Sequence, residues 1–130
     1  MTKHTGALVV LGMLLAATCL DAQTARTGRL MREKLQHSQR ILMALTTSDY
    51  GLLQRETAAL TKIAQSPQWA ELMTAELLPY TGGFTRALES LSAAAERRDY
   101  DAAGASYSAL TTACFSCHKH VMNSRIAAGP

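Results

Sequence analysis

The chain has 130 residues, about one domain's worth, with 13 Lys and Arg against 10 Asp and Glu and a net charge of +3. Apolar residues make up 48%, which excludes a disordered tail, and three cysteines are too few for a disulfide framework. The basic residues are scattered and form no nucleic-acid footprint, while the low aromatic count of 5% leaves Leu, Ala or a bound group to fill the interior.

Residues 1–22 have the form of a secretory signal peptide: a short polar start, an apolar stretch from about 7 to 17, and small residues near the end. The apolar stretch is too short to span a bilayer comfortably. We expect cleavage after Ala22, which leaves residues 23–130 as one exported, periplasmic domain without a transmembrane segment. Lipidation at Cys19 is a minor alternative, because the residues before it match a lipoprotein site poorly.

The first helix of this domain is expected over about 25–45. Apolar or small residues recur there with spacings of 4, 3, 4 and 3, which is the pattern of the inward face of a bundle helix. This predicted seam consists of Met31, Leu35, Ser38, Leu42 and Leu45. The residues 46–49 then supply a break, with Asp49 as the capping residue of the next helix.

The second helix is expected over about 50–65, with Leu53, Leu60 and Ile63 inward and with Gln54, Arg55 and Glu56 largely outward. A proline at the first position of a helix is tolerated, so one or two helical turns are expected after Pro67.

Pro79 and the pair Gly82-Gly83 indicate a longer irregular connection. The third helix is expected over about 84–97 and the fourth over about 100–123, capped by Asp99. No stretch alternates with period 2 for long enough to predict a strand. The fold class is therefore all-α, and four amphipathic helices with mostly short connections predict an antiparallel up-down four-helix bundle.

The chemistry is concentrated in the fourth helix, where Cys114-Phe115-Ser116-Cys117-His118 forms a C-x-x-C-H sequence. This pattern is typical of covalent haem attachment. On a helix, Cys114 and Cys117 lie nearly on one face, so their sulfurs can form thioethers to the two vinyl groups along one porphyrin edge. His118 can then bind the iron as an axial ligand. One haem c inside the bundle would also account for the few aromatic side chains.

A disulfide, a thiol-redox pair and a zinc site are weaker interpretations of these residues. A disulfide between Cys114 and Cys117 has poor geometry on a helix. A thiol-redox C-x-x-C normally opens a helix after a strand, and no strand is expected here. A zinc site using both cysteines with His118 and His120 would need four converging ligands, which a continuous helix does not supply.

The chain resembles the cytochrome c′ group over about residues 26–122: four helices, a signal peptide, C-x-x-C-H near the end of the last helix, and Trp69 in the connection between the second and third helices. The resemblance implies that the second face of the iron meets the first helix at or near Met31. Members with Met there are six-coordinate and look like electron carriers. Members with Leu or Phe there are five-coordinate and bind nitric oxide or carbon monoxide. Trp69 and Leu35 are implied as pocket residues.

Met31 therefore becomes the candidate distal ligand of a low-spin member, and its thioether would raise the reduction potential. A core methionine that fills a gap is the alternative interpretation of Met31, and ligation by His37 is an alternative for the iron. The family's basic residue four positions after the proximal histidine is replaced here by Met122.

The expected function is single-electron transfer between redox partner proteins, without enzymatic activity; the resemblance also allows a homodimer. Binding of nitric oxide or carbon monoxide at a five-coordinate iron is the alternative. A peroxidase-like activity lacks support, because no distal His and Arg pair is evident beyond His37 with Arg40.

Overall fold

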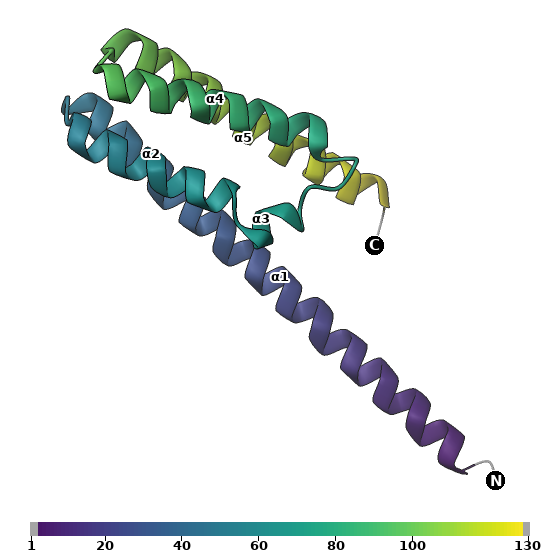
Figure 1. Cartoon of the computed structure of the whole chain (residues 1–130). Helices are drawn as coiled ribbons and strands as arrows, with labels where there is room; N and C mark the ends of the chain where they lie inside the picture. Colours follow the sequence, from purple (N-terminus) through teal and green to yellow (C-terminus); the bar gives the residue numbers. More distant parts are fainter. Residues whose placement is uncertain (1–2, 129–130) are drawn as a thin grey trace. The chain divides into compact units, whose positions relative to one another are not determined.

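The computed structural model describes the backbone of residues 3–128 and the side chains of residues 22–124. It divides into two compact units, Met1–Glu33 and Lys34–Pro130, which are described separately. The first unit holds the N-terminal part of helix α1 (Lys3–Thr46), drawn in purple and blue in Figure 1. The predicted signal peptide with Cys19 falls almost wholly on residues whose side chains lie outside the description, so it stays a prediction.

The second unit holds the end of α1 and four further helices: α2 (Tyr50–Ala64), α3 (Pro67–Ala70), α4 (Leu78–Arg97) and α5 (Tyr100–Ala128). Connections of a few residues turn α1 back into α2 and α4 back into α5, and Figure 1 shows α4 and α5 running side by side. Every element in the described range is helical. The predicted all-α class and its packing as a helical bundle are confirmed.

Side-chain caps explain where α2 and α5 begin. The Oδ1 atom of Asp49 accepts a hydrogen bond of 2.8 Å from the backbone amide of Leu52. Asp99 does the same for Ala102 at 3.0 Å. Each carboxylate satisfies an amide that the first turn leaves without a helical partner, and its negative charge lies at the positive end of the helix dipole. The two caps predicted from the sequence are confirmed.

The predicted irregular connection at Pro79 and Gly82-Gly83 is wrong, because α4 already begins at Leu78 and includes all three residues. Pro79 lies in the first turn, where its missing amide hydrogen costs no helical hydrogen bond. A Cβ atom at Gly83 would stand 3.9 Å from the Cβ atom of Ala113 on α5, so α4 and α5 approach closely here. Packing of α4 against α5 outweighs the low helix propensity of two glycines.

The interior of the second unit is built from aliphatic side chains and two aromatic ones. The predicted inward face of α4 is confirmed, since each of its four residues is at most 4% exposed. These are Phe84, Leu88, Leu91 and Ala95. On α2, Leu53 and Leu60 are 1% exposed, as expected. The few large aromatic residues are thus replaced mainly by Leu and Ala in the core.

The buried face of α1 is displaced by one residue from the predicted seam. Ile41 and Ala44 are 0% and 1% exposed, whereas Leu35 and Leu42 of the seam are 57% and 48% exposed. Leu45, at the end of the seam, is buried at 7%. The displacement arises because α1 turns His37 toward α2, where a buried carboxylate binds it, and this fixes the rotation of the helix.

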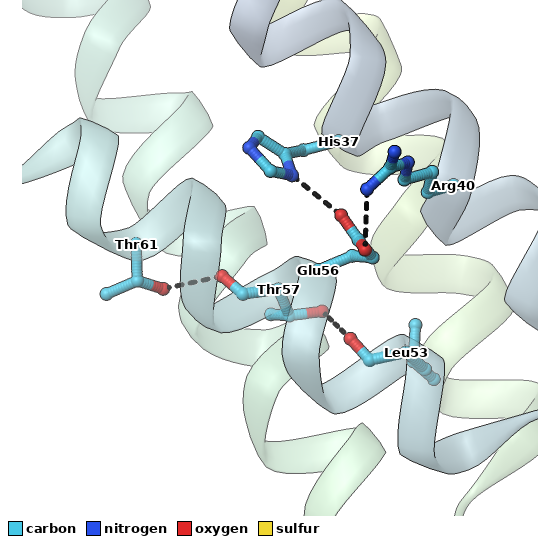
Figure 2. Close-up of polar contacts among 6 residues, drawn as sticks. All are labelled: His37, Arg40, Leu53, Glu56, Thr57 and Thr61. Atoms are coloured by element: carbon cyan, nitrogen blue, oxygen red, sulfur yellow. Dashed lines mark hydrogen bonds and ion pairs between the residues drawn. The ribbon is translucent and has the colours of Figure 1, made fainter.

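That carboxylate belongs to Glu56, which the sequence placed outward and the structure buries at 6% exposure. Figure 2 shows its two oxygens directed at α1: Oε2 lies 2.6 Å from Nδ1 of His37, and Oε1 accepts from Nη1 of Arg40 at 3.4 Å. Burial alone would raise the pKa of Glu56, but the hydrogen bond from His37 and the charge of Arg40 outweigh it and lower the pKa. Glu56 therefore holds α2 against α1 as a charged group.

Among the described residues, no helix combines the length and the hydropathy needed to cross a lipid bilayer.

Candidate haem-attachment site

The C-x-x-C-H residues lie within the continuous helix α5, which runs on for ten residues after His118. Cys114 and Cys117 are half-buried and carry free thiols. His118 is exposed, and so is Phe115 at 75%. The helical spacing expected for the motif is therefore present, with both cysteines half-buried and His118 exposed.

An aromatic pair and a lysine pack together near the place where α4 approaches α5 at Gly83 and Ala113. The rings of Trp69 and Phe84 are 5.5 Å apart between centroids and inclined at 45°. The Nζ atom of Lys34, on α1, stands 3.8 Å from the centroid of each ring. Trp69 is 5% exposed, and its role as a pocket residue stays a prediction.

Charge and burial act in opposite directions on the groups of this cluster. Burial lowers the pKa of Lys34 to about 8, while the charges of Cys114 and Cys117 oppose the shift. Burial raises the pKa of Cys114, and the nearby ammonium of Lys34 opposes that shift in turn. The thiol of Cys114 is thus protonated at neutral pH and partly shielded from solvent.

The histidines of the described part of the chain differ in their partners. His37 is bonded to Glu56. His120 bonds Oε1 of Glu76 through Nε2 at 2.8 Å and stacks on Tyr80 with ring centroids 4.7 Å apart. His118 makes no hydrogen bond, ion pair or ring contact with any side chain that the structure describes. Its imidazole is therefore the one in this range that is free to bind a metal through either nitrogen.

A hydrogen-bonded pair shows which side of α1 faces the motif. The hydroxyl of Tyr107 on α5 donates to the backbone carbonyl of Ser38 at 3.0 Å and lies 3.3 Å from its Oγ atom. Cys114 and His118 follow Tyr107 by seven and eleven positions, so the three share one face of α5. Ser38 likewise shares one face of α1 with the exposed Leu35.

The predicted seam of α1 is therefore not its buried face, but Leu35 and Leu42 lie on the side of the helix that Ser38 turns toward α5. We call this the α5 side of α1, defined by Leu35, Ser38 and Leu42. Leu35 does not line an enclosed pocket in this structure, and its role as a pocket residue stays a prediction. Met31 is half-buried and belongs to the first unit, so its ligation of the iron also stays a prediction.

The segment between α3 and α4 is tied to α5 just beyond the motif. Glu76 accepts hydrogen bonds from His120 and from Oγ of Ser124 at 3.1 Å. These two hydrogen bonds lower the pKa of the Glu76 carboxyl. The contacts hold the end of the connection in place two residues after His118, and they leave His120 occupied.

The structure bears on the zinc and disulfide interpretations of the two cysteines. Within the described residues, no group of three or more His, Cys, Asp and Glu side chains converges as a metal site would require. His120, one of the four zinc ligands considered, is directed at Glu76 instead. Both cysteines are free, so no disulfide joins them.

A groove of about 700 Å³ runs along α4 and α5, lined mostly by small side chains with Tyr80 and Arg86. Ser116 contributes to it, but neither cysteine does. Cys114 lies on the face of α5 opposite Ala109, Thr112 and Ser116, which line the groove.

Lys34 is the residue that sequence reasoning missed. It shares a face of α1 with His37 and Ile41, which follow it by three and seven positions. A lysine within this inward repeat was the available signal, but the stronger apolar repeat one residue later concealed it.

The chain matches no protein-family profile, no curated protein sequence and no solved structure. The resemblance to the cytochrome c′ group therefore depends on the motif and on the helix pattern of the chain itself.

Proposed function

We propose that the protein is an exported, periplasmic c-type cytochrome that carries single electrons and holds one haem c on α5. The observation that carries this proposal is the combination of two free, half-buried thiols with an unengaged imidazole one residue further along the same helix. The donor set fits the group, because thioether formation needs free thiols and axial ligation needs a free ring nitrogen.

Cys114 and Cys117 anchor the haem. Each thiol adds across one vinyl group, with the sulfur bonded to one carbon and the hydrogen to the other, so that the addition consumes no oxidant. When bound, the haem iron supplies one-electron chemistry by alternating between Fe(III) and Fe(II). Trp69 and Phe84 are buried and would supply apolar surface near the haem.

His118 is the proximal axial ligand in this proposal, and Met31 is the distal one. Fixed ligands on both faces change little between the two oxidation states, which suits a carrier that acts between redox partner proteins and has no substrate of its own. Leu35 and Leu42 support the location, since an exposed apolar stripe on the α5 side of α1 indicates that something covers it.

Attachment is tested by producing the full chain in a bacterial host that exports and matures c-type cytochromes. We expect the purified protein to be heavier by one haem, with the haem retained after denaturation and extraction into acidified organic solvent. The variant Cys114→Ser, Cys117→Ser should lose this covalent haem, whereas His120→Ala should keep it. A wild-type protein without haem, in cells that mature other c-type cytochromes, would falsify the proposal.

The distal ligand is tested on the same holoprotein by absorption spectroscopy. We expect a low-spin ferric spectrum with the weak long-wavelength charge-transfer band typical of methionine ligation. Met31→Leu should remove that band and open the iron to nitric oxide and carbon monoxide. A wild-type spectrum that is high-spin and becomes low-spin only with nitric oxide would reject the electron carrier in favour of a gas-binding protein, with Leu35 and Trp69 as steric gates. An unchanged spectrum in Met31→Leu would reject Met31 as the ligand.

A further inference from the structure

Lys34 places a charged group against two buried aromatic rings. Its Nζ atom lies 3.8 Å from the ring centroids of both Trp69 and Phe84. Both rings belong to buried residues, at 5% and 4% exposure. Two aromatic faces at this distance attract an ammonium group through their quadrupoles, and the attraction strengthens as water is excluded. The pair is a cradle for a cation, and we call it the Trp69–Phe84 cradle.

The cradle adjoins the part of α5 that bears the motif, because a Cβ atom at Gly83, the residue before Phe84, would stand 3.9 Å from the Cβ atom of Ala113, the residue before Cys114. Burial lowers the pKa of Lys34 to about 8, and Cys114 and Cys117 both act to raise it. The amine is therefore mainly an ammonium at neutral pH. An ammonium has no lone pair, so in the cradle Lys34 acts on its surroundings as a charge rather than as a ligand.

The position beside the sulfurs decides which part of a bound haem would sense this charge. Thioethers to Cys114 and Cys117 fix the vinyl edge of the porphyrin, and the propionates stand on the opposite edge. A cation beside the sulfurs is thus poorly placed to pair with propionates. With a haem held on these sulfurs, the ammonium would act on the tetrapyrrole, whose net charge changes when the iron gains or loses an electron.

We propose that Lys34, held by the Trp69–Phe84 cradle, sets the reduction potential of the haem attached to Cys114 and Cys117. The ferric haem carries one more positive charge than the ferrous haem, so a neighbouring ammonium destabilises the ferric form and raises the potential. This role rests on the proposed function and names the residue that tunes it. Lys34 acts in this proposal through its charge alone.

The test measures the reduction potential of the full-length holoprotein and of charge variants. Lys34→Gln and Lys34→Met remove the charge, and we expect each to disfavour reduction by about tenfold. For a one-electron couple this fold-change corresponds to about 59 mV. Lys34→Arg keeps the charge and should keep most of the potential. Lys62→Gln is the matched control, because it removes the same charge from an exposed position on α2, where solvent and salt screen it.

The measured potentials decide whether the charge of Lys34 sets the reduction potential. Wild-type potentials in both Lys34→Gln and Lys34→Met would overturn the inference, and so would an equal shift in Lys62→Gln. A changed axial-ligand spectrum in Lys34→Gln would show that the amine binds the iron, which also overturns it. A holoprotein with the expected covalent haem and unchanged potentials separates this failure from failure of the proposed function, in which no covalent haem is found at all.

Discussion

Helix α1 has two sides that differ in how completely the protein itself covers them. On the side that faces α2, His37 and Arg40 converge on the buried carboxylate of Glu56. On the α5 side, the polar contact is the pair Ser38 and Tyr107, while Leu35 and Leu42 remain about half exposed. The polar groups of the first side all have partners within the chain, and the second side presents exposed apolar side chains.

The difference lies in how far the chain's own groups satisfy and cover each side. A buried charge without partners would be costly, so the α2 side has a full set of partners. Large aliphatic side chains that are exposed side by side cost some free energy of solvation. Extended apolar patches of this kind mark binding surfaces. Under the proposed function, the haem on Cys114 and Cys117 covers the α5 side.

The largest expected effect concerns the imidazole beside the thiols. His118→Ala should abolish the normal ligation of the iron, because no second free imidazole stands nearby in the described part of the chain. His120→Ala should leave the absorption spectrum of the holoprotein intact, since His120 is occupied by Glu76 and Tyr80. Equal spectra for wild type and His118→Ala would break the assignment of His118.

The next effect compares two aliphatic residues of α1. Ile41→Ala removes a fully buried side chain and should lower the free energy of unfolding of the haem-free protein by about 3 kcal/mol. Leu35→Ala, at an exposed position, should change it by less than about 0.5 kcal/mol. Urea denaturation followed by circular dichroism measures both. In the holoprotein, Leu35→Ala should cost more than it does without haem, and an identical small cost in both forms would argue against haem at this side.

Glu56→Gln tests the side of α1 that faces α2. Removing the charge that His37 and Arg40 share should lower the free energy of unfolding by about 2 kcal/mol at neutral pH. The pKa of Glu56 is lowered in the folded state, so its stabilisation is present above its ordinary unfolded value and is lost as the pH falls through the lower folded one. Below about pH 4 the difference between wild type and variant should therefore shrink. A difference that grows on acidification would contradict this sign.

The smallest effect concerns the polar contact of the α5 side. Tyr107→Phe removes the hydroxyl that donates to Ser38 and should cost about 1 kcal/mol, less than Glu56→Gln, because the bond is neutral and half-buried. The same denaturation measurement compares the two variants. If Tyr107→Phe lowered the free energy of unfolding more than Glu56→Gln does, the polar contact on the α5 side would be the stronger one, contrary to this prediction.

Much of the second unit could be predicted from the sequence because local chemistry decides it. Asp49 and Asp99 cap the helices that follow them, and Phe84 and Leu91 lie on the buried face of α4 as their spacing predicted. The error at Gly82-Gly83 has a tertiary cause, since close packing of α4 against α5 holds these residues in a helix that their own propensity disfavours.

The rotation of α1 could not be read from periodicity alone. Two overlapping repeats run along the same helix, one through Leu35 and Leu42 and one through His37 and Ile41, and they differ by about one residue. Apolarity favours the first repeat as the core. The partner that α2 supplies in Glu56 makes burial of His37 favourable, and no feature local to α1 announces that partner.

The sequence by itself determined the helical class, the caps and the five-residue motif with its two thiols and imidazole, because each depends on residues within a few positions of one another. Only the tertiary structure decided that Lys34 meets Trp69 and Phe84 beside those thiols and that Glu56 is buried against α1. Both arrangements join residues from different helices, and their energy comes from burial and charge that exist only after the helices have packed.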